Sequence, residues 1–383
     1  MPERVYLDWN ATTPLRPEAR AAMAAAWDIA GNPSSVHAEG RQARRVVEDA
    51  RAAIAAAVGG RPQDVVFTSG GTEANALALT PGVRHGSGQP ARRLLVSAIE
   101  HTSVLSGGRF SPEAIGTIDV TGSGLVDLDH LRRLLAAGPP ALVSVMLANN
   151  ETGAIQPISE VADVVHEAGG LLHIDAIQAL GKIPFEIKSL NADLITLSAH
   201  KIGGPKGVGA LVLGEDVQLE ALLRGGGQEL GRRAGTENVA GIAAFGAATS
   251  AAMAALAPNA RRLQSLQERL EKGLMQTASM IVFSADVPRL PNTTLFTVPG
   301  LKAETAVIGF DLGGIAVSSG SACSSGKVQP SHVLSAMGIA RDLAQGAVRL
   351  SLGWSTSEAD IDLALQAWRK LADALLRGRR NTA

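Results

Sequence analysis

Short apolar runs alternate with helical patterns through the first two thirds of the chain, and this alternation is the feature that most restricts the fold. The runs lie at residues 64–70, 92–101, 140–153, 170–179, 192–201 and 207–214. Helical patterns separate several of them, as at residues 71–79 and 158–169. Strands that are apolar on both faces are typical of a mainly parallel sheet covered by helices on both sides. The sequence therefore predicts an α/β fold, whose ligands bind at the carboxyl ends of the strands.

The sequence pattern changes near residue 257, which indicates a second domain. Before this point, Pro17 suits the first position of a helix, and another helix is expected over residues 37–58. Beyond it, leucines at helical spacing mark an amphipathic helix, and short strands are expected near residues 281–283 and 292–298. We therefore predict a large domain at residues 16–257 and a smaller α+β domain formed by residues 1–15 and 258–383.

Charge and composition limit the classes of partner. With 35 basic and 36 acidic residues, the chain has a net charge of −1 and no broad charged surface for nucleic acid or an acidic membrane. The uncharged stretch at residues 239–258 is long enough to span a bilayer, but small residues dominate it, so we expect a buried, closely packed helix. The first ten residues contain no apolar stretch of signal-peptide type, and we expect a cytoplasmic protein. A small-molecule substrate is therefore favoured.

Several common site types are missing from the sequence. The single cysteine, Cys323, excludes an internal disulfide and a thiolate zinc site, and there is no H-E-x-x-H motif, so no metal site is predicted. There is no G-x-G-x-x-G turn. The nearest approach to a Walker loop, at residues 320–327, has one residue too many between its glycines, and Val328 stands where Ser or Thr belongs. A bound phosphate would therefore belong to a group other than NAD or ATP.

A phosphate-binding turn is one interpretation of residues 69–72. A predicted strand ends in Ser69, Gly70 and Gly71, and a helix begins at Thr72. Free N–H groups and the helix dipole at such a position suit a phosphate. An ordinary strand-to-helix turn is the alternative, because Gly and Thr also cap helices.

A carboxylate and a lysine follow two neighbouring apolar runs. Asp175 stands where one run ends, and Lys201 ends the next, beside His200. In isolation, Asp175 is also compatible with a turn cap, and Lys201 with a surface turn. Together with Thr72 they form the set that pyridoxal 5'-phosphate requires: an amine that carries the cofactor, a carboxylate that keeps its ring nitrogen protonated, and donors that bind its phosphate. We therefore predict that Lys201 carries this cofactor covalently.

Motifs spread over residues 6–353 resemble those of the cysteine desulfurases. The matching stretches are YLDWNATTP, GNPSSVHAEG, TSGGTEANALAL, EHTSVL, NNETGAIQPI, HIDAIQALGKIP, SAHKIGGPKGVGAL, RRAGTENVAGI, SSGSACSS and VRLSLG. The resemblance implies the aspartate-aminotransferase type of fold (fold type I), a homodimer that uses pyridoxal 5'-phosphate, and the removal of sulfur from L-cysteine to leave alanine.

The resemblance also implies roles for individual residues around the cofactor. Lys201 would hold the cofactor, Asp175 would pair with its pyridine nitrogen, and Gln178 would hydrogen-bond its ring hydroxyl. His101 would stack on the ring and carry a proton. The phosphate would be bound by Gly71, Thr72, Ser198 and His200, together with Thr236 of the partner subunit.

A second group of residues would act on the substrate. Asn150 would touch cofactor and substrate, and Arg349 would bind the substrate carboxylate with two hydrogen bonds. Cys323, among small polar residues rather than the apolar neighbours of a structural cysteine, would be the catalytic thiol. Lys201 would take the α proton, and Cys323 would attack the substrate sulfur, leaving a persulfide that passes to an acceptor protein.

Two other classes of function share these features. A selenocysteine lyase, or another β-elimination or aminotransfer enzyme with the same cofactor, would use the same core residues. A noncatalytic sulfur-transfer scaffold would keep the fold alone, and the intact set Lys201, Asp175, His101 and Cys323 argues against it. Among acceptors, we favour an iron–sulfur scaffold protein over nitrogenase assembly or thio-modified RNA.

Overall fold

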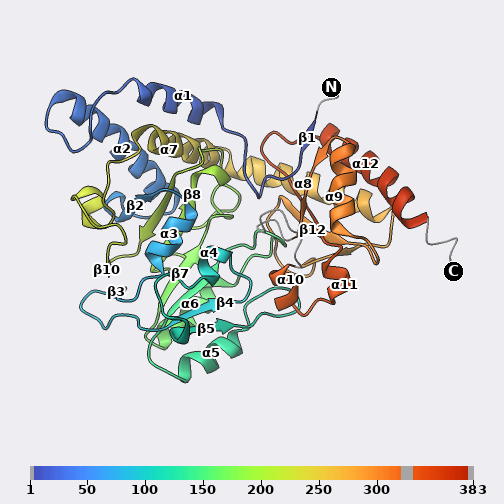
Figure 1. Ribbon diagram of the computed structural model, residues 1–383, viewed down its shortest axis with the longest axis horizontal. Coiled ribbons are helices and arrows are strands. Elements are labelled where there is room, and N and C mark those ends of the chain that lie inside the picture. Colours follow the sequence, from blue (N-terminus) through green and yellow to red (C-terminus); the bar gives the residue numbers. More distant parts are fainter. Residues whose placement is uncertain (1–3, 321–330, 378–383) are drawn as a thin grey trace.

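The computed structural model describes residues 4–320 and 331–377 of the chain. Figure 1 shows the C-terminal elements, coloured orange to red, beside the part that holds the long sheet. The N-terminal strand, in blue, lies against these C-terminal elements although almost the whole chain separates them.

A seven-stranded sheet forms the centre of the larger part. Its strand order is β2-β9-β8-β7-β6-β4-β5. The strands are β2 (Val65–Thr68), β4 (Leu94–Ser97), β5 (Ile115–Ile118), β6 (Leu142–Met146), β7 (Leu171–Asp175), β8 (Leu194–Ser198) and β9 (Gly209–Leu213). The pairs from β5 through β4, β6 and β7 to β8 are parallel, whereas β9 runs antiparallel to both β8 and β2. The predicted mainly parallel sheet is therefore confirmed, with one reversed strand that the sequence pattern did not indicate.

Both faces of this sheet are covered, as the apolar runs predicted. Successive residues of a strand point to opposite faces, so Leu142 joins one hydrophobic cluster and Val143 joins another. The helices of this part are α1 (Pro17–Trp27), α2 (Ala38–Ala57), α3 (Gly71–Ala78), α4 (Thr102–Leu105), α5 (Leu128–Ala136), α6 (Ile158–Glu167) and α7 (Val239–Ala254). Short elements between them are β3 (Arg84–His85), β10 (Val217–Gln218), and the 3₁₀ turns at Pro62–Asp64, Pro112–Ala114, Ala199–Lys201 and Gln228–Gly231.

Helix α7 is the uncharged stretch for which the sequence left a membrane span to be considered. It packs against α1 and α2, and a Cβ at Gly246 would lie only 2.7 Å from the Cα of Ala50, so small residues permit this close approach. Within residues 4–320 and 331–377, no single helix is long and apolar enough to cross a bilayer. Among the described helices, α7 and α8 (Leu256–Met275) meet this criterion of length and apolar character only when taken together, across a bend of 69°.

The C-terminal part has a core of its own. A four-stranded sheet in the order β11-β12-β15-β14 lies against α8, α9 and α12. The elements are β11 (Ile281–Val282), β12 (Thr293–Thr297), α9 (Ala303–Leu312), β13 (Ile315–Ala316), β14 (Ser318–Ser319), α10 (His332–Ala336), α11 (Arg341–Ala344), β15 (Val348–Ser351) and α12 (Glu358–Arg377). Strand β1 (Val5–Tyr6) pairs with β13, which brings the N-terminal residues into this core. The division at residues 16 and 257 stays a prediction.

One local feature differs from the sequence prediction. The run at residues 192–201 was predicted as a strand that ends at Lys201, but β8 ends at Ser198 and a 3₁₀ turn follows. Ile202 and Gly204 both donate main-chain hydrogen bonds to the carbonyl of Ala199, so this segment bonds within itself instead of extending the sheet ladder. Gly203 has φ +93°, and a Cβ there would lie 2.4 Å from Cγ of Arg16, so the turn requires glycine. His200 and Lys201 therefore lie beyond the strand end, above the sheet edge.

Candidate functional site

A cavity lies at the carboxyl ends of β6, β7 and β8. Its volume is about 300 Å³, at the lower end of the range for small-molecule sites. It is lined by Asn10, Ala11, Gly71, Thr72, His101, Ser103, Met146, Ala148, Asn150, Asp175, Ile177, Gln178, Ser198, His200, Lys201 and Arg349. Every residue that the sequence suggested for the site lies here except Thr236 and Cys323.

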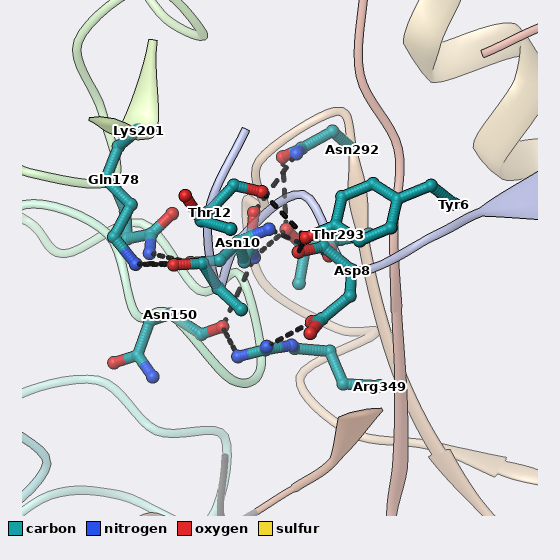
Figure 2. Close-up of polar contacts among 12 residues, drawn as sticks. Tyr6, Asp8, Asn10, Thr12, Asn150, Gln178, Lys201, Asn292, Thr293 and Arg349 are labelled. Atoms are coloured by element: carbon teal, nitrogen blue, oxygen red, sulfur yellow. Dashed lines mark hydrogen bonds and ion pairs between the residues drawn. The ribbon is translucent and has the colours of Figure 1, made fainter. Parts of the chain in front are cut away.

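The amine of Lys201 projects from the turn after β8 toward the N-terminal segment. Its Nζ donates to the main-chain carbonyls of Asn10, over 2.6 Å, and Ala11, over 2.8 Å. Figure 2 shows Asn10 between Lys201 and Gln178 on one side and Asn292 and Thr293 on the other. The N-terminal segment thus contributes to the cavity through main-chain oxygens, which no side-chain motif reveals.

Asp175 ends β7 and faces the cavity with a buried carboxylate. Asn75 donates to its Oδ2 over 3.0 Å, and the main-chain N–H of Ile177 donates to its Oδ1 over 3.0 Å. Burial raises the pKa of Asp175, while these two hydrogen bonds oppose the rise, as do Lys201 and, when it is protonated, His101. A cationic group bound in the cavity would supply the partner that a buried carboxylate needs.

His101 stands directly before α4, where its ring nitrogen caps the helix. Its Nδ1 lies 2.8 Å from Ser103 Oγ and accepts from the Ser103 main-chain N–H over 3.2 Å. Because Nδ1 is an acceptor, the neutral ring carries its proton on Nε2. Burial lowers the pKa of His101, the charges of Lys201 and His332 lower it further, and Asp175 opposes them. The surroundings of His101 therefore favour its neutral form.

The start of α3 has the features of an anion site. Gly70, the residue before the helix, provides no side-chain cap, so the first main-chain N–H groups remain available, with Thr72 beside them. A Cβ at Gly71 would lie 2.3 Å from Cδ1 of Ile177, so the close approach requires glycine. Burial lowers the pKa of His200 to about 4, with further lowering by Lys201, and keeps this ring neutral. Amide, hydroxyl and imidazole donors at this end fit a phosphate group.

Arg349 on β15 closes the opposite end of the cavity and is 1 % exposed. Its Nη2 pairs with Asp8 Oδ1 over 2.8 Å, and its Nη1 donates to the main-chain carbonyl of Asn150 over 2.9 Å. Its Nε has no partner among the described residues. Two of five N–H groups are used, so the guanidinium keeps donors for a substrate carboxylate. Figure 2 shows the side-chain amide of Asn150 pointing away from Arg349.

Two predicted residues do not line the cavity. Thr236 is exposed and does not line the cavity of its own chain. Cys323 lies outside the described residues. Gly320 and Ser331, the described residues nearest to it on either side, both approach Glu151. Burial raises the pKa of Glu151 to about 7, although Ser331 donates to its carboxylate over 2.5 Å and Arg349 adds positive charge.

Several site residues were missed at the sequence level. Asn10 accepts from Gln178 and Lys201 through its main chain and donates to Asn150 O and Thr293 through its side chain. Asn75 links Asp175 to Ser103, which in turn contacts His101. Both asparagines lie within stretches that matched family motifs, which was the available signal. Their partners lie far away in sequence, and only the fold reveals them.

The mainly parallel sheet and the cavity at its carboxyl edge define an α/β enzyme of the pyridoxal phosphate transferase type. The chain belongs to the class-V aminotransferase family, whose model matches residues 5–364. Members of this family depend on pyridoxal 5'-phosphate. The predicted fold class is thereby confirmed.

Individual proteins similar to this chain belong to a narrower group than the family as a whole. The chain is 42 % identical over 381 residues to a cysteine desulfurase of Cereibacter sphaeroides, with 97 % of each chain covered. It is 41 % identical to an IscS-like cysteine desulfurase of Mycobacterium tuberculosis, which covers 98 % of this chain and 97 % of that one. The structure of a NifS-like protein from Rickettsia africae matches with a TM-score of 0.88 and 38 % identity, covering 97 % of this chain and 100 % of that chain. The resemblance predicted from the motifs is confirmed.

Proposed function

We propose that the chain is a cysteine desulfurase that uses pyridoxal 5'-phosphate. One observation carries the proposal: the amine of Lys201, the carboxylate of Asp175 and the start of α3 line a single cavity. Nearly full-length similarity to cysteine desulfurases supports the same activity here. When bound, the cofactor supplies a conjugated ring that stores the electrons released at the α carbon of an amino acid.

The residues present fit this cofactor. Gly71 and Thr72 would bind its phosphate with Ser198 and His200, and Asp175 would pair with its ring nitrogen. Gln178 would hydrogen-bond its ring hydroxyl, and His101 would lie against the ring. The carboxylate of Asp175 is held in place before any ligand arrives, because Asn75 and Ile177 already occupy one lone pair on each oxygen.

The chain's own residues divide the chemistry between them. Arg349 and Asn150 orient the substrate carboxylate, and Lys201 moves the proton at the substrate α carbon. The Cys323 thiolate attacks the sulfur of cysteine, so that a sulfur–sulfur bond forms as the carbon–sulfur bond breaks. The bond electrons return to the carbon skeleton, which takes up a proton, with His101 as carrier, and leaves as alanine. A persulfide remains on Cys323.

Borohydride reduction of the holoenzyme, followed by peptide mass mapping, tests the first step of this proposal. We expect the reduced cofactor on Lys201. Lys206 and Lys182 lie in the same region and serve as internal controls. Cofactor mass on either of these lysines, with Lys201 unmodified, would contradict the assignment.

We also propose a homodimer in which Thr236 completes the cofactor site of the partner subunit. The exposure of Thr236 and its absence from the lining of its own cavity support this arrangement. Mixed dimers of Thr236→Ala and Lys201→Ala subunits provide the test. If Thr236 acts across the interface, one site per mixed dimer is intact and activity returns on mixing. If it acts within its own subunit, both sites stay defective.

For the sulfur, we propose an acceptor protein of iron–sulfur cluster assembly in the cytoplasm, with iron and the cluster as cargo.

Turnover of cysteine compared with selenocysteine distinguishes the desulfurase from a selenocysteine lyase. We expect a higher kcat/KM with cysteine. A preference for selenocysteine would assign the chain to the lyases.

A further inference from the structure

Lys182 is a second lysine beside the cofactor cavity, and none of the roles above involves it. It lies in the turn after β7, four residues beyond Gln178. Its Nζ donates to Gln178 Oε1 over 2.5 Å and to Asn10 Oδ1 over 3.1 Å. The main-chain carbonyl of the same Asn10 accepts from Lys201 Nζ. One asparagine therefore joins the two amines.

The surroundings of Lys182 are unusual for an amine. No carboxylate within residues 4–320 and 331–377 pairs with it at ion-pair distance. A small cavity of about 30 Å³, with room for about one or two water molecules, has Lys182, Lys201 and Arg16 as the charged residues of its lining. Burial, followed by the charges of Lys201 and Arg349, lowers the pKa of Lys182 well below its ordinary value. The charged groups that face it are therefore cations.

The contact with Lys182 decides which end of the Gln178 amide faces the cavity. Lys182 Nζ donates to Gln178 Oε1, so the oxygen end of the amide faces Lys182. The Nε2 end is then directed the other way, where it donates to the Asn10 carbonyl over 3.0 Å. Nε2 carries two N–H groups and uses one for Asn10, which leaves the other for a ligand in the main cavity that Gln178 lines.

We propose that Lys182 is a positioning residue of the cofactor site, which orients the Gln178 amide and places a second amine next to Lys201 through their shared contacts with Asn10. The inference rests on the proposed function, because Gln178 then donates to the ring oxygen of the cofactor.

The charge of Lys182 and its orientation of the Gln178 amide both lower the pKa of the Lys201 nitrogen when the cofactor is joined to it. Lys182 in its charged form disfavours positive charge on that nitrogen. A donor to the ring oxygen has the same consequence, because it takes up negative charge that otherwise stabilises the protonated nitrogen. The nitrogen therefore loses its proton at lower pH when Lys182 is present.

The test is a pH titration of the visible absorbance of the holoenzyme without substrate, for wild type, Lys182→Met, Lys182→Gln and Lys182→Arg. Loss of one charge-assisted contact is expected to raise the midpoint in the Met variant by about one pH unit. The Gln variant, which keeps a donor but no charge, is expected to shift less. The Arg variant is expected to stay within a few tenths of a unit of wild type. Lys188→Met, at an exposed lysine of the same region, is the matched control and is expected to leave the midpoint unchanged.

Two results would overturn the inference. One is an unchanged midpoint in both uncharged variants at full cofactor content, and the other is an equal shift in all three variants. The Gln and Arg variants keep the test decisive where the Met variant does not fold. A wild-type protein without a visible cofactor band would instead overturn the proposed function, and the role of Lys182 with it.

Discussion

The side-chain amide of Asn75 donates to Asp175 Oδ2 over 3.0 Å, although a hundred residues separate them in the chain. The same amide nitrogen lies 2.9 Å from Ser103 Oγ, and the Thr196 hydroxyl donates to the Asn75 side-chain oxygen, Oδ1, over 2.6 Å. Asn75 is fully buried. It therefore connects the carboxylate of Asp175 to the helix cap formed by His101, two groups to which the proposed reaction gives different tasks.

Replacing Asn75 by Ala removes all three contacts and leaves buried polar groups without partners. We predict that the free energy of unfolding falls by about 1–3 kcal/mol, as measured by urea denaturation. The pKa of Asp175 would rise further, because a hydrogen bond to its charged form is lost, and the acid limb of the pH profile of kcat/KM would move upward. Ser103→Ala keeps the Asp175 contact and is the control. An equal shift of the acid limb in that variant would contradict the role of Asn75.

Cys323→Ser is predicted to separate cofactor binding from sulfur transfer. The variant keeps Lys201 and the cavity residues, so its visible absorbance should equal that of wild type. A serine hydroxyl does not form a persulfide, and trapping with an alkylating reagent followed by mass spectrometry should detect none after addition of cysteine. Sulfide release at the wild-type rate would show that another group accepts the sulfur.

Arg349→Lys is predicted to weaken the use of cysteine. Lysine lacks the planar fork that binds a carboxylate through two parallel bonds, and it cannot retain the contacts with Asp8 and Asn150 together. We expect kcat/KM to fall by about 10- to 150-fold, which corresponds to one lost charge-assisted hydrogen bond. Arg269→Lys, at an exposed ion pair with Glu358, is the control and should leave kcat/KM unchanged. Steady-state kinetics with L-cysteine supplies the measurement.

His173 is predicted to make the fold sensitive to acid. It is fully buried on β7, with Nδ1 2.8 Å from Ser144 Oγ, and burial lowers its pKa to about 3. In the unfolded chain the His173 imidazole has its ordinary pKa of about 6.5 and binds a proton below that pH. The free energy of unfolding therefore falls as the pH drops from about 6.5 toward about 3, by up to about 1.4 kcal/mol per pH unit.

His173→Gln removes this contribution, so the difference in unfolding free energy between variant and wild type should change with pH in that window. Urea denaturation at about pH 7 and about pH 5 measures it. His85→Gln, at an exposed histidine, is the matched control. A constant difference between His173→Gln and wild type at both pH values would show that His173 does not titrate in this way.

Sequence reasoning succeeded where a single stretch carries both structure and chemistry. Asp175 and Lys201 interrupt apolar runs, and residues that follow neighbouring parallel strands meet at one sheet edge, so their meeting in one cavity was predictable. The turn that holds Lys201 was not predicted, because the apolar pattern continues through Ala199 and the competing hydrogen bonds to its carbonyl come from residues beyond the run.

The supporting residues were harder to predict, because their contacts join distant parts of the chain. Asn10 lies at the cavity because β1 pairs with β13 and Asn10 itself bonds to Ser351 and Thr293. Lys182 contacts Gln178 within one turn, which local spacing allows, but the lack of a carboxylate partner among the described residues depends on the whole surrounding fold. The reversed strand β9 likewise depends on pairing with both β2 and β8.

Alanine formed from L-cysteine by the purified holoenzyme, measured beside Lys201→Ala, tests the central claim most directly. Lys201 is proposed both to hold the cofactor and to move the α proton. We predict that wild type releases alanine in step with sulfide when a reductant is present. The variant should lose the cofactor absorbance and at least about 10²- to 10⁴-fold in rate. Alanine formation by Lys201→Ala at the wild-type rate, or no alanine from a fully loaded wild type, would contradict the account.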